Sequence, residues 1–564
     1  MDTRTRIQVL IDYSQYYGVS KTLEDAKKMI ENIPSQSLIH YISSINLNLY
    51  LRENDDDDSI NYQRSIANDI LSKIGGEYEK KFADMLNKQV AANQNPILFW
   101  NYSNLKFYDL IFENFNTLPY RALTSSEFQI FLDVYLIIND IANKKNNTDK
   151  EDIENAVSKN ELENLLITNY IYQKDYLSSL DYANQVVRGV YFFRYLENDP
   201  RFGGVMDQYY ASKNVSGYLE MFKNLITLVS DSGIEKTKRT PILDVEKHLQ
   251  YKFVTEPYID SLCINNNIST YKTDDSFTAI RNGCLFKLDT NRYILLNVNF
   301  LFDHFYKSQV FAVNSFLSNK NITKEFLSIK GKDFTDKIYF PAILENCFPE
   351  YVTYFGDHCK NSSNQELCDA YIRDGNNVIL IEFKDVLLNA KVKNAIDEVS
   401  LFQEFHTKFV ENKSGAPKGI RQLQAAIEDI NANGVTFDEG CNGKNLNIYP
   451  IIVYTDLSFG AEGLNKMYRG KFNDLISSMQ ISNASIKDLT FINLNFFEQR
   501  QDYFADGSDK IFELLDEFGK HIKNIIYERT TFETFSRFYT RENYTLEVRQ
   551  PKIYLDFQEQ IVMS

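Results

Sequence analysis

The sequence predicts a mixed α/β protein in which a large all-helical N-terminal region precedes a mixed sheet covered by helices. Two observations support this prediction. Up to about residue 235, apolar residues recur at three-to-four spacing, as in residues 105–115 and 128–142, which indicates amphipathic helices. After about residue 331, short β-prone runs alternate with helical segments, an order typical of an α/β sheet.

Composition restricts the class of protein. The chain has 564 residues, of which 43% are hydrophobic and 24% charged, as expected for a globular protein with more than one domain. Its net charge of −16 argues against a protein that coats nucleic acid, so any polyanion must be bound locally. The apolar run before Asp12 is too short for a signal peptide, and no stretch approaches 18 apolar residues. The six cysteines form no CxxC pair. We therefore expect a cytoplasmic protein without a membrane partner.

Changes in pattern along the chain suggest four parts. Residues 1–235 form the helical region, and a linker at Lys236–Pro241 precedes a small mixed α/β module at 242–328. Within that module, residues 283–297 look like two strands, the second continuing through Val298. Residues 331–500 carry the α/β pattern, and residues 501–564 are expected to be helices that pack on it.

The 331–500 part has a defined order of expected elements. These are a helix at 334–348, strands at 368–373 and 378–384, helices at 394–411 and 418–431, a strand at 446–455, a polar helix at 463–479 and a strand at 488–494.

The turn between the first two of these strands sets a register. Asp374-Gly375-Asn376-Asn377 lies between two β-prone runs and predicts a hairpin. If Asp374 pairs with Asn377, antiparallel register places Glu382 opposite Asp369. Side chains alternate along a strand, so Lys384 shares the face of Glu382. The sequence therefore brings two carboxylates and an ammonium group together.

Facing carboxylates repel each other unless a positive charge lies between them, and a divalent metal would supply it. Mg²⁺ is held by one or two carboxylates and keeps water and phosphate in its other positions. An acid two residues before a lysine is not specific by itself, because the same spacing occurs at residues 25–27, 79–81 and 411–413. Only the copy at 382–384 ends an apolar strand behind a hairpin that supplies a third charged group. We therefore favour a site here over a solvated strand end.

Asp369 followed by Ile381-Glu382-Phe383-Lys384 resembles the D-x(n)-E-x-K core of the PD-(D/E)XK nuclease superfamily, which has the restriction-endonuclease-like fold. Gly331-Lys332-Asp333-Phe334-Thr335-Asp336 resembles the opening of that family's first core helix. Lys418-Gly419-Ile420-Arg421-Gln422-Leu423 resembles its later helix, which often supplies a glutamine. The resemblance covers residues 331–500.

The resemblance implies a role for each matching residue. It implies that Asp369, Glu382 and the backbone carbonyl of Phe383 bind Mg²⁺ or Mn²⁺, that Lys384 is catalytic, and that Gln422 assists. Two positions depart from the family pattern. Cys368 stands where proline is nominal, and Thr335 stands where glutamate is usual. The second departure leaves Asp336 or Glu345 as the substitute acid.

The function implied is a metal-dependent endonuclease that hydrolyses phosphodiester bonds, with DNA favoured over RNA because no RNA-reading motif is evident. By analogy, such a nuclease with a large N-terminal region resembles a bacterial host-defence or restriction-type effector. The helical region would then bind the target, a second copy of the chain or a defence-system partner. The alternative is a catalytically silent nuclease-like fold that binds nucleic acid or assembles with a partner.

Overall fold

The computed structural model describes residues 7–53, 59–92, 94–145, 163–168, 171, 180–232, 240–361, 363–395, 397–505, 510–543 and 552–563. The chain divides into two compact units. The first contains the described residues up to 149, residue 180 and residues 196–312. The second contains the described residues of 150–175, residues 181–195, and the described residues from 313 onward. Among all described residues, none of the helices combines the length and apolar character needed to cross a bilayer.

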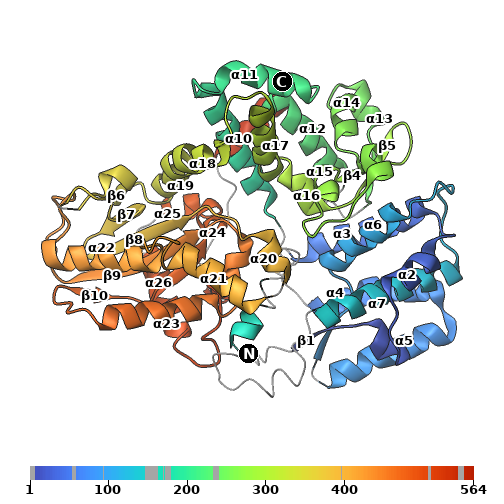
Figure 1. Cartoon of the computed structure of the whole chain (residues 1–564), viewed down its shortest axis with the longest axis horizontal. Helices are drawn as coiled ribbons and strands as arrows, with labels where there is room; N and C mark the ends of the chain where they lie inside the picture. The colour runs from blue at the N-terminus through green and yellow to red at the C-terminus, as the bar shows by residue number, and fades with distance from the viewer. Residues whose placement is uncertain are drawn as a thin grey trace. The chain divides into compact units, whose positions relative to one another are not determined.

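The first unit is mainly helical but contains two small sheets (Figure 1). Strands β1 and β2 pair in parallel, and β3, β5 and β4 form an antiparallel sheet in that order. The prediction of an all-helical N-terminal region is therefore wrong at β1 and β2. The elements of this unit are β1 (Ile7–Leu10), α1 (Tyr13–Tyr17), α2 (Leu23–Ile30), α3 (Ser35–Glu53), α4 (Ser59–Ile74), α5 (Gly76–Ala91), β2 (Gln94–Ile97), α6 (Asn101–Glu113), α7 (Ser125–Lys145), α11 (Gly203–Ser212), α12 (Tyr218–Asp231), β3 (Ile242–Asp244), α13 (Glu246–Gln250), α14 (Glu256–Ser261), η1 (Ile264–Thr270), α15 (Thr278–Asn282), β4 (Leu285–Lys287), β5 (Arg292–Leu295) and α16 (Val298–Asp303).

The second unit is built around a mixed six-stranded sheet, in the yellow and orange part of the ribbon in Figure 1. Its strand order is β10-β9-β8-β7-β6, and β11 also pairs with β9. Helices α10 (Tyr182–Asn198) and α17 (Lys307–Asn319) each run from one unit into the other. The remaining elements are α18 (Phe326–Ile329), η2 (Lys330–Tyr339), α19 (Phe340–Cys347), β6 (Val352–Phe355), η3 (Gly356–His358), β7 (Ala370–Asp374), β8 (Asn377–Lys384), α20 (Ala390–Ala395), α21 (Glu398–Phe409), α22 (Ile420–Asn433), β9 (Leu446–Tyr454), η4 (Leu457–Gly460), α23 (Leu464–Ser477), β10 (Ala484–Ile486), β11 (Thr490–Asn493), α24 (Leu494–Glu498), α25 (Gln501–Ala505), α26 (Lys510–His521), α27 (Phe532–Asn543) and α28 (Lys552–Met563).

These units do not coincide with the four parts expected from the sequence. Residues 242–312 belong to the same unit as the N-terminal helices, and most of the expected linker at Lys236–Pro241 lies outside the described residues. Residues 501–564 belong to the unit of the large sheet. There, Glu533 of α27 accepts hydrogen bonds from the Tyr454 hydroxyl of β9 and from the backbone N–H of Asn493 on β11.

The hairpin predicted around Asp374 is confirmed. Strand β7 pairs with β8 in antiparallel register, with Asp374 opposite Asn377 and Ala370 opposite Ile381. Strand β8 also pairs in parallel with β9 over its whole length. β8 has a neighbour on each side as far as Ile381, and its last three residues remain paired with β9. The position of the residues that close β8 is therefore well defined.

Side-chain caps account for two differences from the expected elements. The second strand of the 283–297 pair ends at Leu295, because Asn297 accepts a hydrogen bond from the N–H of Phe300 and begins α16. The helix expected over 394–411 is two helices, because Asp397 caps α21 by accepting from the N–H of Ser400. Asparagine and aspartate favour such N-cap positions over the helix interior.

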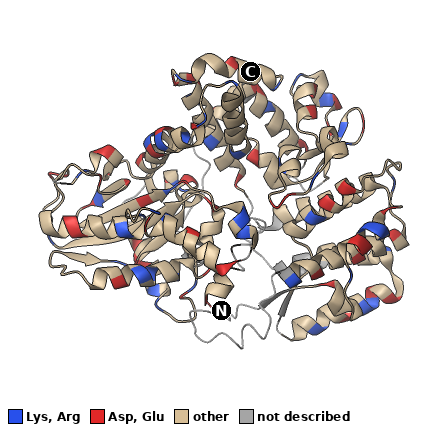
Figure 2. Ribbon diagram, in the orientation of Figure 1, with Lys and Arg blue, Asp and Glu red and all other residues tan. Residues whose placement is uncertain are grey.

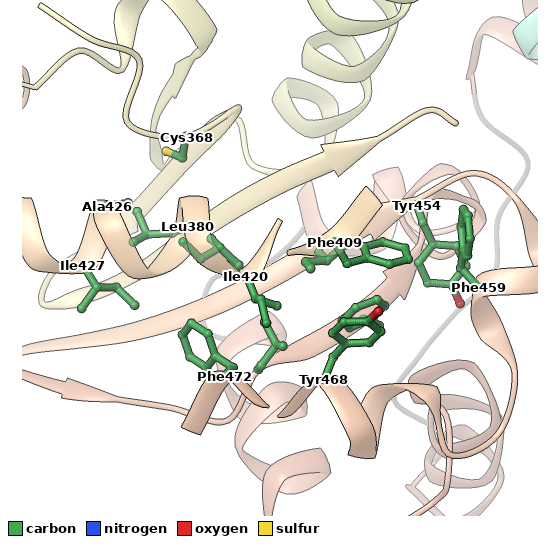
Figure 3. Close-up of a cluster of buried hydrophobic side chains, with 14 of the residues drawn as sticks. Cys368, Leu380, Phe409, Ile420, Ala426, Ile427, Tyr454, Phe459, Tyr468 and Phe472 are labelled. Atoms are coloured by element: carbon green, nitrogen blue, oxygen red, sulfur yellow. The ribbon is translucent and has the colours of Figure 1, made fainter. Parts of the chain in front are cut away.

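One face of the large sheet packs against α21, α22 and α23 around Phe409. The ring centroid of Phe409 lies 5.0 Å from that of Phe459 and 5.3 Å from those of Tyr468 and Phe491. Figure 3 shows Phe409, Phe459 and Tyr468 gathered in this cluster, all fully buried. Since Leu380 of β8 belongs to the same cluster, the core supports the strand that carries Glu382 and Lys384.

We expect Phe409→Ala to lower the free energy of unfolding of this unit by about 3–5 kcal/mol, because it removes a large buried ring and leaves a cavity. Chemical denaturation followed by circular dichroism would measure the loss. Val399→Ala is the control on the same helix: Val399 is 78% exposed, and its truncation should change stability by less than about 0.5 kcal/mol. Equal effects of the two substitutions would contradict the assignment of Phe409 to the core.

Candidate functional site

The candidate site is centred on Glu382 and Lys384 at the end of β8. Glu382 is buried, and its Oε2 accepts a hydrogen bond from Lys384 Nζ at 2.8 Å. Lys384 Nζ also donates to Gln422 Oε1 at 3.3 Å. Three of the side chains predicted from the sequence are thus in direct contact.

Asp369 forms hydrogen bonds to the residues on either side of Glu382, beyond the last pair of the β7–β8 ladder. The ladder between β7 and β8 ends at Ala370, one residue short of the predicted pairing of Asp369 with Glu382. Asp369 donates its backbone N–H to the carbonyl of Ile381 at 3.0 Å, and its Oδ2 accepts from the N–H of Phe383 at 2.6 Å. The carboxylate therefore takes the place of a backbone acceptor beyond the end of β7. Phe383 supplies its N–H here, and the predicted role of its carbonyl as a metal ligand stays a prediction.

Gln422 is held by the turn that begins α22. Its Oε1 accepts from the N–H of Gly419 at 2.8 Å as well as from Lys384. Gly419 has a φ of +47°, and a Cβ at this position would lie 2.7 Å from the carbonyl oxygen of Phe409. Only glycine fits this close approach. Gly419 therefore fixes the start of α22 and, with it, the position of Gln422.

Of the two alternatives for a further acid, Asp336 is the one that interacts electrostatically with Asp369 and Lys384. Asp336 lies on η2, and burial together with the negative charges of Asp369 and Asp385 raises its pKa to about 7. It still presents an exposed side chain. Glu345 is exposed on α19, and the group it influences is Tyr191. Among the described residues, no hydrogen bond or ion pair links Glu345 to Asp369, Glu382 or Lys384, so its suggested role stays a prediction.

The site contains more carboxyl groups than basic groups. Burial and the charge of Asp369 raise the pKa of Glu382, while Lys384 opposes that rise. For Lys384, burial disfavours the charged form, but the carboxylates of Glu382, Asp369 and Asp336 raise its pKa overall. The ammonium group thus stays protonated among several carboxyl groups. One positive charge is not enough to balance them.

The structure adds two acids that sequence reasoning missed. Glu366 lies near Asp369, and desolvation together with the charge of Asp369 raises its pKa. Asp385 follows Lys384 directly, and its Oδ2 accepts from Lys330 Nζ at 2.5 Å. Asp385 could have been identified from the sequence, because it directly follows Lys384. Its pairing with Lys330 could not, because 55 residues separate the two positions.

Asp369 and Glu382 have carboxylate oxygens that could bind a divalent metal. Among the described residues, no three His, Cys, Asp or Glu side chains form a ready-made metal cage. However, Asp369 and Glu382 each use only one carboxylate oxygen in hydrogen bonds to described residues. Two such oxygens, with Asp336 nearby, match the way Mg²⁺ is bound by one or two carboxylates and several waters. A bound cation would also balance the excess acid.

Comparison with known proteins adds no relative. No protein-family model, curated protein or solved structure matches the chain. The interpretation of the site therefore depends on its own residues and geometry.

We expect Gly419→Ala to destabilise the protein more than Gly415→Ala. Both glycines have positive φ, so each substitution introduces backbone strain of about 1 kcal/mol. A Cβ at Gly415 meets nothing within 4 Å, whereas one at Gly419 overlaps the backbone of Phe409. Chemical denaturation should show an additional loss for Gly419→Ala of about 1–3 kcal/mol. Equal losses would show that the approach to Phe409 is not tight.

Proposed function

We propose that this protein is a metal-dependent endonuclease that hydrolyses phosphodiester bonds of nucleic acid, with DNA favoured over RNA. The observation that carries the proposal is the convergence of Asp369, Glu382, Lys384 and Gln422 at the end of one buried strand. A carboxylate pair beside a lysine is a set that can support metal-assisted cleavage of a phosphodiester. The arrangement is also consistent with the resemblance to the PD-(D/E)XK nucleases and with the proposed role as a host-defence or restriction-type effector.

Mg²⁺ or Mn²⁺, when bound, would lower the pKa of a coordinated water and neutralise charge on the reacting phosphate. Asp369 and Glu382 would hold it through the carboxylate oxygens that accept no hydrogen bond from described residues. Asp336, which interacts electrostatically with Asp369, is our candidate for a further acid, although the described residues contain no ready-made group of three metal-binding side chains. Glu382 lies within β8, and Asp369 is tied to β8 by two hydrogen bonds, so these donors are held before substrate arrives.

Lys384 has two tasks in this proposal. It stays protonated, and its Nζ donates to both Glu382 and Gln422, so its position is fixed from two sides. Held in this way, the ammonium group can donate a hydrogen bond to the attacking water or to a phosphate oxygen as negative charge develops. A preorganised donor of this kind stabilises the transition state without reorganisation.

A rigid loop beside the site is a suitable contact for the nucleic-acid backbone. In the loop 411–419, Asn412 Oδ1 accepts from the N–H groups of Ser414 and Ala416 and from the Ser414 hydroxyl. The loop carries Lys413 and Lys418, and neither lysine has a carboxylate within 4 Å among the described residues. Phosphate contacts of this kind provide affinity without sequence selection.

The charge distribution favours a local contact of this kind and argues against a wide basic surface. Figure 2 shows acidic and basic residues interspersed along the described ribbon. Arg421, three residues after Lys418, forms an ion pair with Glu411 and is partly neutralised. We therefore assign the backbone contact to Lys413 and Lys418.

We expect Asp369→Asn and Glu382→Gln each to abolish Mg²⁺-dependent cleavage and to weaken Mn²⁺ binding, because each removes a charged donor. Cleavage of plasmid, linear duplex, single-stranded DNA and RNA would be followed with Mg²⁺ or with chelator, and Mn²⁺ affinity by calorimetry. Glu345→Gln is the matched control, since it removes an exposed acid away from the site and should change neither measurement. Unchanged Mn²⁺ affinity in both site variants would remove these carboxylates from a metal site.

We expect Lys384→Ala to retain nucleic-acid affinity within a few-fold but to lose cleavage by about two orders of magnitude, the scale for loss of one preorganised donor. The double substitution Lys413→Ala and Lys418→Ala should instead weaken binding and reduce its dependence on salt. Electrophoretic mobility shift and single-turnover cleavage separate the two effects. If the wild-type chain binds nucleic acid, cleaves none of these substrates, and behaves like Lys384→Ala, the catalytically silent binding protein becomes the better interpretation.

A further inference from the structure

A buried ion pair lies directly behind the candidate site. Lys330 Nζ contacts Asp385 Oδ2 at 2.5 Å, and the exposed fractions of the two side chains are only 10% and 17%. Asp385 Oδ1 also accepts from the Thr455 hydroxyl at 2.9 Å, and the Thr335 hydroxyl donates to the backbone carbonyl of Lys330. Burial disfavours the charged carboxylate, but Lys330 lowers the pKa of Asp385 overall.

The partners of this pair come from three elements. Asp385 immediately follows β8 and Lys384, Thr455 immediately follows β9, and Lys330 is the first residue of η2. Lys330 and Asp385 therefore join the start of η2 to the strand ends at the site. The contact is short and fixed in direction, because Asp385 is bonded on both oxygens.

The element joined in this way has an uncommon form. η2 is a π-helix of ten residues, whereas π-helical segments are usually single turns and often occur at functional sites. At its other end, the ring of Phe340 stacks on that of Phe383 with centroids 4.2 Å apart and planes at 3°. Tyr339 donates to Glu498, which in turn accepts two hydrogen bonds from Arg188. The segment is anchored on both sides of Asp336.

We propose that Lys330 and Asp385 are positioning residues, which hold η2, the element that carries Asp336, against the strand end that carries Glu382 and Lys384, and thereby set the affinity of the site for a divalent cation. This inference rests on the proposed metal-dependent function. Neither residue needs to touch metal or substrate. The lysine also balances the charge of Asp385, which would otherwise add to the excess acid at the site.

The test compares Mn²⁺ affinity of the full chain with its thermal midpoint. Lys330→Gln and Asp385→Asn should each lower Mn²⁺ affinity, measured by calorimetry, by roughly 10-fold or more, the scale for groups that orient metal ligands. Lys330→Arg keeps the charge and should remain within about threefold of the wild type, on the same scale. Asp336→Asn combined with Lys330→Gln should lose less affinity than the two separate losses together predict, because both act through the same carboxylate.

A matched ion pair separates positioning from stability. Arg373 and Asp438 form a similarly buried pair at the far end of β7, with exposed fractions of 12% and 4%. Arg373→Gln should lower the thermal midpoint and leave Mn²⁺ affinity unchanged. If Lys330→Gln fails to fold, Lys330→Met combined with Asp385→Asn replaces both charges, which buried sites often tolerate, and should show the same loss of affinity.

Two results would overturn the inference. Wild-type Mn²⁺ affinity in the folded Lys330 and Asp385 variants would show that the pair only stabilises the fold, as would an equal loss of affinity in Arg373→Gln. Failure of the proposed function gives a different result. In that case the wild-type chain itself would bind no Mn²⁺, Asp369→Asn would change nothing, and the inference would fall with the function on which it rests.

Discussion

A buried carboxylate at the end of a central strand is the constraint on which the site depends. Glu382 cannot be buried as a charged group without a partner, and Lys384 two residues later on the same face supplies it. The side chain of Lys384 is only 11% exposed and has a second acceptor, which Gln422 provides. Gln422 reaches that position because Gly419 allows α22 to begin against the backbone of Phe409. Each contact therefore requires the next.

The same physical argument extends to the other face of the site. Asp369, Asp336 and Glu366 add negative charge around a single lysine, and Asp385 is the acid that has its own cation in Lys330. An arrangement with unbalanced acid is costly for the fold alone. Functional sites are where such clusters occur, because a cation or a developing charge can later balance them. This cost supports the metal-dependent function that we propose.

Local signals in the sequence predicted the hairpin and most of the site. Alternation placed Glu382 and Lys384 on one face, and the turn at Asp374 set a register that holds as far as Ala370. The prediction failed at the strand end, where Asp369 uses its side chain to reach Phe383. Register rules describe backbone pairs, and they do not apply where a side chain replaces the backbone. The strands β1 and β2 were missed because two short strands add little to a helical pattern.

The sequence by itself determined the hairpin, the shared face of Glu382 and Lys384, and the glycine before α22, because turns, alternation and caps depend on neighbouring residues. The tertiary structure alone decided that Asp336 interacts electrostatically with Asp369, and that Lys330 pairs with Asp385. Those contacts join residues of different elements. Their formation depends on how η2 packs against the ends of β8 and β9, which no local pattern specifies.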